Sequence, residues 1–258
     1  MTLLLAVLAL AAPPPPGAPI PRDPAVLAAR LGSTTHELAA AIDRWHPRTG
    51  RVPGDVTLYA LYQQRILILL SEKPRLAKAV FERLRRRPLR SEVLARRNLG
   101  RLSQPRPLKA FRTGPAEPAD RLRGYYLEAQ RRFGVAWNVL AAVNYVESAF
   151  NKLRNASTAG AQGPMQFIPS TWRRYGLGGN VHDPHDAILG AANYLHANGA
   201  PRNYRRALYR YNPSWLYVDA VVRYARRIRA EPRAYYVFYS RQVFVRTPHG
   251  LVRLTGPR

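Results

Sequence analysis

The chain has 258 residues, a formal net charge of +26 and a pI of about 11.4. It contains no cysteine, which excludes disulfide bonds, thiolate metal sites and a lipid-modified N-terminal cysteine. Only four of its 41 basic residues are lysine, so the surface is rich in arginine. Such a surface should bind polyanions, and nucleic acid, anionic membranes and anionic cell-wall polymers are all candidates.

The N-terminus predicts export. Residues 3–12 (LLLAVLALAA) form an apolar run that is far shorter than the roughly 20 residues of a membrane-spanning helix. Ala9-Leu10-Ala11 offers a small-x-small cleavage site, so residues 1–12 are predicted to be a signal peptide, although no basic residue precedes the run. We therefore expect a location in the periplasm, cell wall or medium, with no transmembrane segment and no nucleic acid as partner.

The next part of the chain is predicted to be a linker followed by helices. Residues 13–24 contain seven prolines and should be an extended linker. Residues 25–112 are predicted to be a helical region, with a capping box at Thr34–Glu37 and a long helix over 55–71. Pro74 and Pro88 should each open a further helix. The arginine cluster at 83–90 is interpreted as a solvated helix face, and no chemistry is expected in this region.

A proline-rich linker at 104–118 separates this region from a second helical domain, predicted over 118–231. Its centre is a helix from Ala136 that is apolar almost all round and therefore buried. A loop with small residues follows over 151–171, and short helices follow the loop. Residues 232–258 are predicted to form a β-hairpin, with strands at 235–246 and 251–254.

His182 and His185 suggest a metal site, but their spacing is not that of a two-histidine zinc helix. Asp183 fits the N-cap of a helix and Pro184 fits its first position. We therefore interpret this segment as a helix start, and predict no metal and no cofactor.

Glu147 lies in the last turn of the apolar helix, on the same face as Leu140, Val143 and Asn144. Burial disfavours an ionised carboxylate and should raise its pKa. The arginine-rich surface acts in the opposite direction, but salt screens exposed charges beyond about 10 Å at 0.1 M, so we expect desolvation to dominate. A carboxyl group that stays protonated near neutral pH can act as a general acid. The alternative is a glutamate that simply reaches solvent at the helix end.

Most glycosidases need a second carboxylate as nucleophile or base. The first acidic residue after Glu147 is Asp183, so the intervening loop offers none. Folding could still bring Asp183, Asp186 or Asp219 near. Alternatively, the nucleophile is a hydroxyl group of the substrate, whose proximity gives it a high effective molarity. Such an enzyme needs one acid/base residue and a set of groups that position the sugar.

Several motifs occur in order along this domain, and together they resemble the soluble lytic transglycosylases of bacterial peptidoglycan over about residues 120–231. They are Glu147–Asn151 (ESAFN), Ser157, 159–172 (AGAQGPMQFIPSTW), 192–195 (ANYL) and Tyr211-Asn212. The resemblance implies a mainly α fold: a goose-type-lysozyme-like catalytic domain, here with an N-terminal helical region and a C-terminal β-hairpin. Pro164 departs from the leucine that is usual in the family and should stiffen the loop.

By this resemblance Glu147 is the single acid/base that cleaves the MurNAc–GlcNAc bond. It would protonate the leaving oxygen and then accept the proton of the muramoyl C6 hydroxyl, which closes a 1,6-anhydro ring. The resemblance also assigns substrate-binding residues: Ser157, Met165, Gln166, Tyr211 and Asn212. Alternatively, Met165 is a core residue and Ser157 only holds the loop. The implied partner is the peptidoglycan glycan strand, and the arginines would hold the protein on anionic wall polymers.

Three other functions are compatible with the sequence. A goose-type lysozyme would hydrolyse the same bond with water. A non-catalytic, cationic wall-binding protein would keep the fold as a glycan clamp. A nucleic-acid-binding protein would account for the charge but not for the predicted export.

Overall fold

The computed structural model describes residues 12–46, 48 and 50–257. The predicted signal peptide lies outside the described residues, except for Ala12. The described part contains eleven α-helices, one short 3-10 helix and two strands: α1 (Pro24–Arg44), α2 (Gly54–Glu72), α3 (Pro74–Leu84), α4 (Arg87–Leu102), η1 (Leu108–Ala110), α5 (Ala119–Phe133), α6 (Trp137–Ser148), α7 (Pro169–Tyr175), α8 (Pro184–Ala197), α9 (Tyr204–Tyr211), α10 (Trp215–Ala230), α11 (Arg233–Ser240), β1 (Phe244–Thr247) and β2 (Gly250–Arg253). The expected mainly α fold with a C-terminal hairpin is confirmed.

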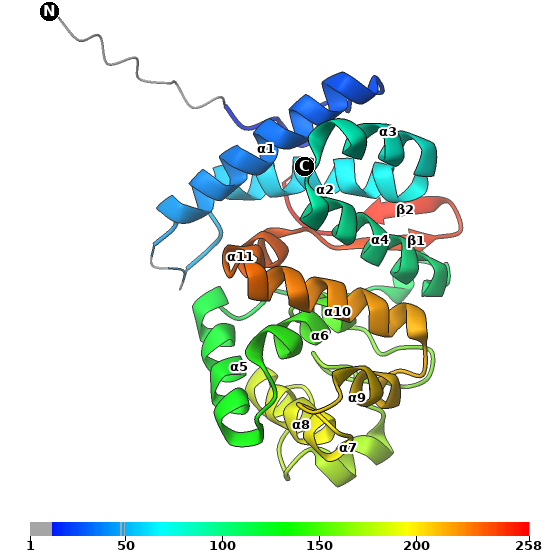
Figure 1. The fold of residues 1–258 in the computed structure, drawn as a ribbon. Helices are drawn as coiled ribbons and strands as arrows, with labels where there is room; N and C mark the ends of the chain where they lie inside the picture. The colour runs from blue at the N-terminus through cyan, green and yellow to red at the C-terminus, as the bar shows by residue number, and fades with distance from the viewer. Residues whose placement is uncertain (1–11, 47, 49, 258) are drawn as a thin grey trace, which may run out of the picture.

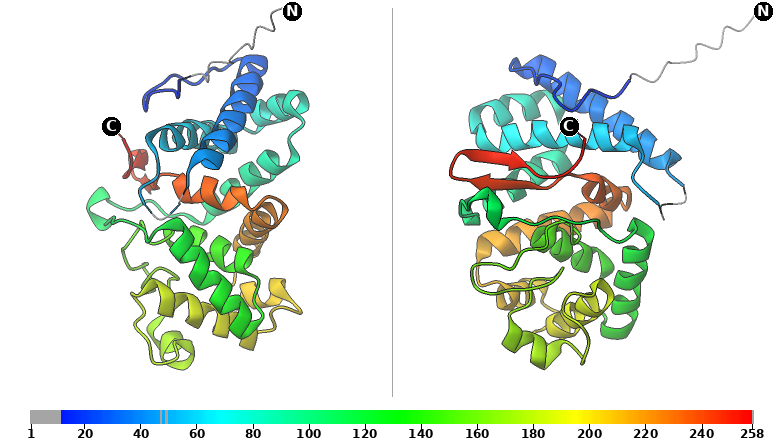
Figure 2. Two further views of the ribbon diagram at one scale, coloured as in Figure 1. Left: turned by 90° about the vertical axis from the view of Figure 1, so that its left-hand side faces the viewer. Right: turned by 180° about the vertical axis from the view of Figure 1, so that it is seen from behind.

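The helices form two stacked layers. In Figure 1, α1 to α4 and the hairpin occupy the upper half, and α5 to α9 occupy the lower half. Helix α10 runs between them and packs on α4 above and on α6 below. The two further views show the same division, with the hairpin on the side of the N-terminal helices (Figure 2). The C-terminal hairpin therefore joins the N-terminal helices rather than the lower layer.

One large core runs through both layers. It contains Leu38 of α1 and Trp45, which directly follows α1, together with Val143 of α6 and Tyr239 of α11. A smaller core lies within α1 to α4, around residues such as Leu31 and Ile66. The continuous core fixes the upper layer against the helix that carries Glu147.

Most of the predicted helices are confirmed. The long helix expected over 55–71 is α2, and prolines stand in the first turns of α3 and α4. The arginines of the 83–90 cluster are exposed, as a solvated face requires.

The capping box predicted at Thr34–Glu37 is wrong. Helix α1 begins earlier, at Pro24, and its N-cap is Asp23, whose side chain accepts hydrogen bonds from the amides of Ala25 and Val26. Thr35 lies inside the helix and donates to the Leu31 carbonyl at 2.6 Å. A hydroxyl that bonds back to the preceding turn does not interrupt a helix, so the spacing alone was misleading.

The first strand predicted at 235–246 is also too long. Residues Arg233–Ser240 form α11, and the strand begins only at Phe244. All residues from Ala234 to Ser240 are buried, and a short run that is buried on every side has no periodicity that separates strand from helix. The hairpin itself is confirmed, with Thr247 paired to Gly250 at the turn.

Candidate active site

Helix α6 ends in a tight turn directly after Glu147. Ala149, Phe150 and Asn151 have φ values of 51°, 63° and 65°, so three consecutive non-glycine residues adopt the left-handed conformation. This conformation is costly outside glycine and persists only where surrounding contacts impose it. Phe150 supplies such contacts, because it is fully buried and its ring stacks on Tyr145 with 5.6 Å between centroids.

The loop that follows is bonded to the same end of α6. The Pro164 carbonyl accepts from Ser148 Oγ at 2.6 Å and from Asn144 Nδ2 at 2.8 Å. Asn144 is itself held by the Tyr126 hydroxyl, which donates to Asn144 Oδ1 at 2.6 Å. All three side chains are buried or nearly so, and the bonds fix the loop relative to Glu147.

The loop backbone at position 163, directly before Pro164, lies so close to the backbone of Val181 that only glycine fits there. Gly163 has a φ of +73°, and a Cβ built on it would lie 1.8 Å from the Val181 carbonyl oxygen. Any other residue at 163 would push the loop away from the segment before α8. This is the physical reason for a glycine before Pro164.

Lys152 attaches the beginning of the loop to the C-terminal region. Its ammonium group donates to the carbonyl of Tyr239 and to that of Arg241, the latter at 2.9 Å. Burial lowers the pKa of Lys152 to about 7, because a charged amine is poorly solvated there. The loop is therefore tied to α11 as well as to α6.

Glu147 accepts a hydrogen bond from a residue of another helix. The Tyr217 hydroxyl, in the first turn of α10, donates to Glu147 Oε1 at 2.6 Å. Burial raises the pKa of Glu147 to about 7, and the Tyr217 bond opposes this rise because it stabilises the carboxylate. The expectation of an elevated pKa caused by desolvation is confirmed. The residue missed from sequence is Tyr217.

Tyr211 lies beside the same carboxyl group. Its hydroxyl donates to the Met165 carbonyl at 2.6 Å, which connects α9 to the loop. The pKa of Tyr211 is raised well above its ordinary value, first by burial and then by the neighbouring Glu147 charge. Phe167 packs against the Tyr211 ring edge to face, with 5.8 Å between the centroids. The phenol is thus a fixed part of the wall next to Glu147.

The three loop residues predicted to bind substrate differ in their surroundings. Met165 is fully buried in the large core, which matches the core alternative. Ser157 Oγ accepts from the amides of Ala159 and Ala161 at 3.2 and 3.0 Å, so it stabilises its own turn. Gln166 has a left-handed φ of 51°, and its amide donates to the Gly163 carbonyl at 3.0 Å.

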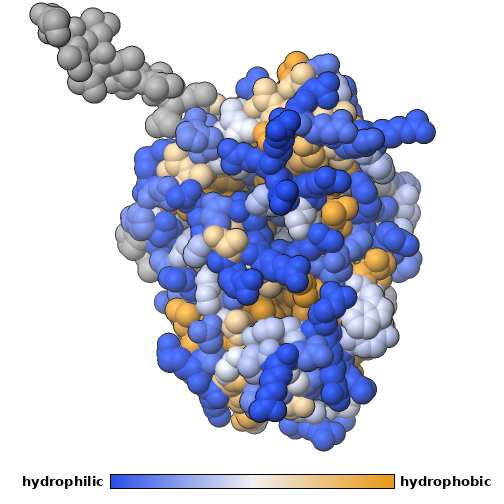
Figure 3. Space-filling model, in the orientation of Figure 1, coloured by the Kyte–Doolittle hydropathy of each residue, from blue (hydrophilic) through white to orange (hydrophobic). Residues whose placement is uncertain are grey.

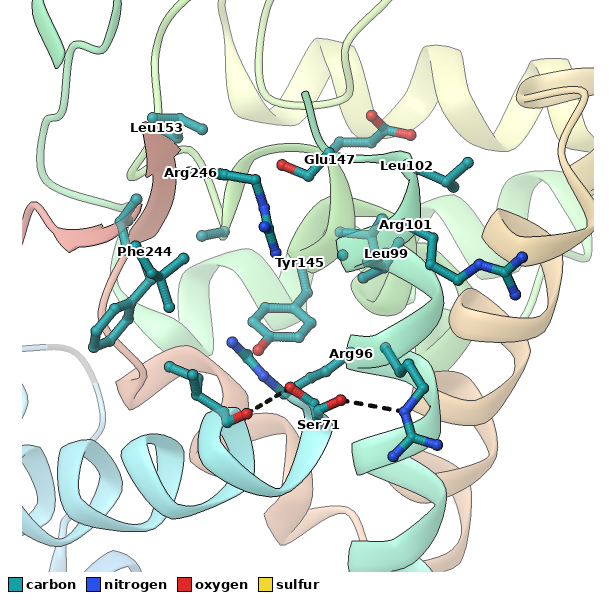
Figure 4. Close-up of a pocket in the computed structure, with 18 of the residues that line it drawn as sticks. Ser71, Arg96, Leu99, Arg101, Leu102, Tyr145, Glu147, Leu153, Phe244 and Arg246 are labelled. Carbon is teal, nitrogen blue, oxygen red and sulfur yellow. Dashed lines mark hydrogen bonds between the residues drawn. The ribbon is translucent and has the colours of Figure 1, made fainter. Parts of the chain in front are cut away.

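A pocket of about 740 Å³ opens beside Glu147. It brings Glu147 together with Tyr217 and Asn212, but its lining does not include Ser157, Met165, Gln166 or Tyr211. The other walls come from the ends of α2 and α4 and from the hairpin. Figure 4 shows Glu147 at one end of this space, Tyr145 in the middle and Ser71 at the opposite end.

The carboxylates considered as partners for Glu147 have other contacts. Asp183 caps α8 by accepting from the Asp186 amide at 3.0 Å, and Asp186 accepts from the Asn180 amide at 2.8 Å. Asp219 pairs with Arg223 Nε at 2.6 Å. None of these three lines the pocket. Glu72 does line it, but this exposed side chain follows Ser71, across the pocket from Glu147 in Figure 4.

Asp183, His185 and Asp186 are close enough to share an ion. Each already has a structural role, because the two aspartates bond amides at the helix start and His185 Nε2 lies 3.0 Å from Glu128 Oε2. Asp183 at the N-cap and Pro184 in the first turn confirm the helix-start interpretation.

Part of the chain is similar to known proteins. A family model described as the transglycosylase SLT domain matches residues 124–227. The "membrane-bound lytic murein transglycosylase F" of Thiobacillus denitrificans is 38% identical over 74 residues, which is 29% of this chain and 15% of that protein. The "membrane-bound lytic murein transglycosylase F 1" of Alkalilimnicola ehrlichii is 28% identical over 160 residues, covering 56% of this chain and 32% of that protein.

The chain thus spans about a third or less of the length of these relatives. No solved structure matches it significantly. Among the described helices, none combines the length and the apolar character needed to cross a bilayer. The matched region runs from α5 to α10, so it contains Glu147, the loop, Tyr211 and Tyr217. The chain therefore carries a transglycosylase SLT domain, in a helical fold of the lysozyme-like class.

Proposed function

We propose that the protein is a lytic transglycosylase that cleaves the MurNAc–GlcNAc bond of peptidoglycan, with Glu147 as its single acid/base. The observation that carries the proposal is the Glu147 carboxyl group at the edge of the pocket, with a pKa raised to about 7 by burial. A carboxylic acid that keeps its proton near neutral pH can protonate a leaving glycosidic oxygen. The SLT domain and the two relatives support the same activity.

The proposed reaction balances within the substrate. The bond from muramoyl C1 to the glycosidic oxygen breaks, and that oxygen takes the proton of Glu147. The C6 hydroxyl oxygen then bonds to C1 and loses its proton to the Glu147 carboxylate. Glu147 is restored, and the product ends in a 1,6-anhydro ring without consuming water.

Tyr217 has a defined part in this scheme. Its hydroxyl donates to Oε1, so it stabilises the carboxylate that exists between the two proton transfers. The other carboxyl oxygen is left for the substrate. Asn212 would form part of the wall against which the sugar lies, and Tyr211 would support it from behind through its bond to the loop. Ser157, Met165 and Gln166 would keep the loop in shape.

The remaining expectations belong to the same proposal. We infer that the protein is exported and that its arginines hold it on anionic wall polymers. Hydrophilic side chains dominate the face drawn in Figure 3, with only scattered apolar patches. Cleavage of whole sacculi should then fall more steeply with added salt than cleavage of small soluble fragments. A reporter fused to residues 1–30 tests export.

Digestion of purified sacculi, followed by mass spectrometry of the soluble products, tests the activity. The wild-type protein should release fragments that end in anhydro rings, and Glu147→Gln should release none while still binding glycan. Reducing ends in place of anhydro ends would identify a hydrolase of the goose-type lysozyme kind. If neither the wild-type protein nor Glu147→Gln cleaves the glycan but both still bind it, the protein is a non-catalytic clamp.

A further inference from the structure

The pocket beside Glu147 has a strongly basic half that lies outside the SLT domain. Four arginines line it, three from α4 and one from β1: Arg96, Arg97, Arg101 and Arg246. Among the described residues, Glu147 and Glu72 are the only acidic ones in its lining. Figure 4 shows Arg96, Arg101 and Arg246 arranged around Tyr145, with Arg246 between Leu153 and Tyr145.

Three of these guanidinium groups have no hydrogen-bond or ion-pair partner among the described residues. Arg97 Nε donates to the Ser71 carbonyl at 3.2 Å. The side chains of Arg96, Arg101 and Arg246 make no hydrogen bond, ion pair or aromatic contact in the described part of the chain, and the Nε atoms of Arg96 and Arg246 are buried without an acceptor. The Arg246 guanidinium reaches across to α4, where its Nη2 is 3.8 Å from the position of a Cβ on Gly100.

Three other arginines that are partly or fully shielded from water are paired. Arg241 and Arg227 both bond Glu92, and Arg223 bonds Asp219. A buried donor without an acceptor costs free energy, and a charged one costs more. The buried Nε atoms of Arg96 and Arg246 lack an acceptor within the described residues, and an anionic ligand in the pocket would supply one.

The proposed substrate indicates which anion would bind these arginines. In a peptidoglycan strand each muramoyl residue can carry a stem peptide with free carboxylates, and these would enter the same pocket as the bond at Glu147. A phosphate on C6 of the reacting muramoyl is incompatible with the proposed reaction, because that oxygen must close the anhydro ring. Arginine matches a carboxylate with two parallel hydrogen bonds.

We propose that α4 and the hairpin form a carboxylate subsite that binds the stem peptide of the strand being cleaved. This inference rests on the proposed function, since the substrate defines the ligand. It assigns the N-terminal helices and the hairpin a role in substrate selection, where the sequence indicated only support.

Equilibrium binding to Glu147→Gln protein tests the subsite without requiring turnover. The ligands are glycan strands that retain their stem peptides and the same strands after amidase treatment. The double variant Arg96→Gln/Arg246→Gln removes two unpartnered guanidinium groups. Its matched control is Arg75→Gln/Arg131→Gln, which removes the same charge from exposed positions outside the pocket. Arg101→Gln, at an exposed position, serves if the double variant does not fold.

The double variant should bind peptide-bearing strands about tenfold more weakly and denuded strands at most about twofold more weakly, as expected for the loss of charge-assisted bonds to a carboxylate. The control variant should lose the same amount of affinity for peptide-bearing strands as for denuded strands. Equal weakening on both strands, or no weakening, would overturn the subsite. The double variant could instead bind a peptide-free strand that carries phosphate about tenfold more weakly than the wild type does. That result would assign the arginines to phosphate and overturn the proposal that they bind the stem peptide. Failure of wild-type protein to cleave either strand would reject the proposed activity but leave this binding difference measurable.

Discussion

The Tyr217 hydroxyl donates a 2.6 Å hydrogen bond to Glu147 Oε1, although the two residues are 70 positions apart. Helix α10 therefore contributes to the pKa of a carboxyl group on α6. Burial raises the pKa of Glu147 and the Tyr217 bond lowers it, and burial has the larger effect. This balance gives a direct prediction for the pH dependence of activity.

Tyr217→Phe should raise the pKa of Glu147 further, because it removes the bond that stabilises the carboxylate. Since the acid form is required, the fall of kcat/KM at high pH should move upward by about one pH unit, and kcat should drop by about tenfold. A pH–rate profile on soluble glycan fragments measures both effects. An unchanged alkaline limb would show that Tyr217 does not act on Glu147.

Glu147→Gln should make the protein more stable at high pH. A folded-state pKa of about 7, against an ordinary value of 4.5, means that the folded protein holds this proton more tightly than the unfolded chain. The stability of the wild type should therefore decrease as pH rises from about 4.5 to about 7. The variant lacks this loss, so its advantage should be near zero at pH 4 and at most about 3 kcal/mol at pH 8.

Urea unfolding of both proteins at these two pH values measures that difference. Glu82→Gln is the control, because Glu82 is exposed and pairs with Lys78 only at 4.0 Å. An equal stability difference between wild type and Glu147→Gln at both pH values would contradict a raised pKa of Glu147 in the folded protein.

Glu92→Gln should destabilise the fold strongly. Glu92 Oε2 accepts from Arg241 Nη2 at 2.6 Å, and the two side chains are only 3% and 1% exposed. Removing the carboxylate leaves the Arg241 charge buried without its counter-ion, which should cost about 3–5 kcal/mol. Thermal or urea unfolding checks this, and a loss comparable with that of Glu82→Gln would show that the Glu92–Arg241 ion pair adds nothing.

Glu72→Gln should leave the rate of cleavage nearly unchanged, because the proposed reaction needs no second carboxylate. Glu72 is the only other acid of the pocket lining, so it is the residue that a hydrolytic mechanism would require. Initial rates of sacculus cleavage, measured for the wild type, Glu72→Gln and Glu147→Gln, show whether either carboxylate is required for cleavage. A loss at Glu72→Gln similar to that at Glu147→Gln would favour hydrolysis.

Sequence patterns predicted the raised pKa of Glu147 because much of its environment is local. The apolar residues of its own helix are enough to indicate burial, and the turn and loop that follow are encoded by neighbouring small residues. The bonds from Ser148 and Asn144 to Pro164 explain why these motifs occur together. The helical character of the chain followed from periodicity in the same way.

Long-range contacts could not be predicted. Tyr217 was not among the predicted site residues. It lies with Val218 and Val221 on the buried part of α10, and only the fold brings its hydroxyl to Glu147, 70 positions away. The pocket arginines were hidden for a similar reason, because α4 and β1 meet only in the folded chain. The six residues Tyr235–Ser240 were mistaken for strand because burial on every side removes the periodic signal.

The most direct test of the account is digestion of sacculi in water enriched in the heavy oxygen isotope, followed by mass spectrometry of the muramoyl ends. If the C6 hydroxyl is the nucleophile and Glu147 the single acid/base, the new ends are anhydro rings that lack one water molecule and contain no heavy oxygen. New reducing ends that carry the heavy isotope would contradict the account and show that water attacks C1.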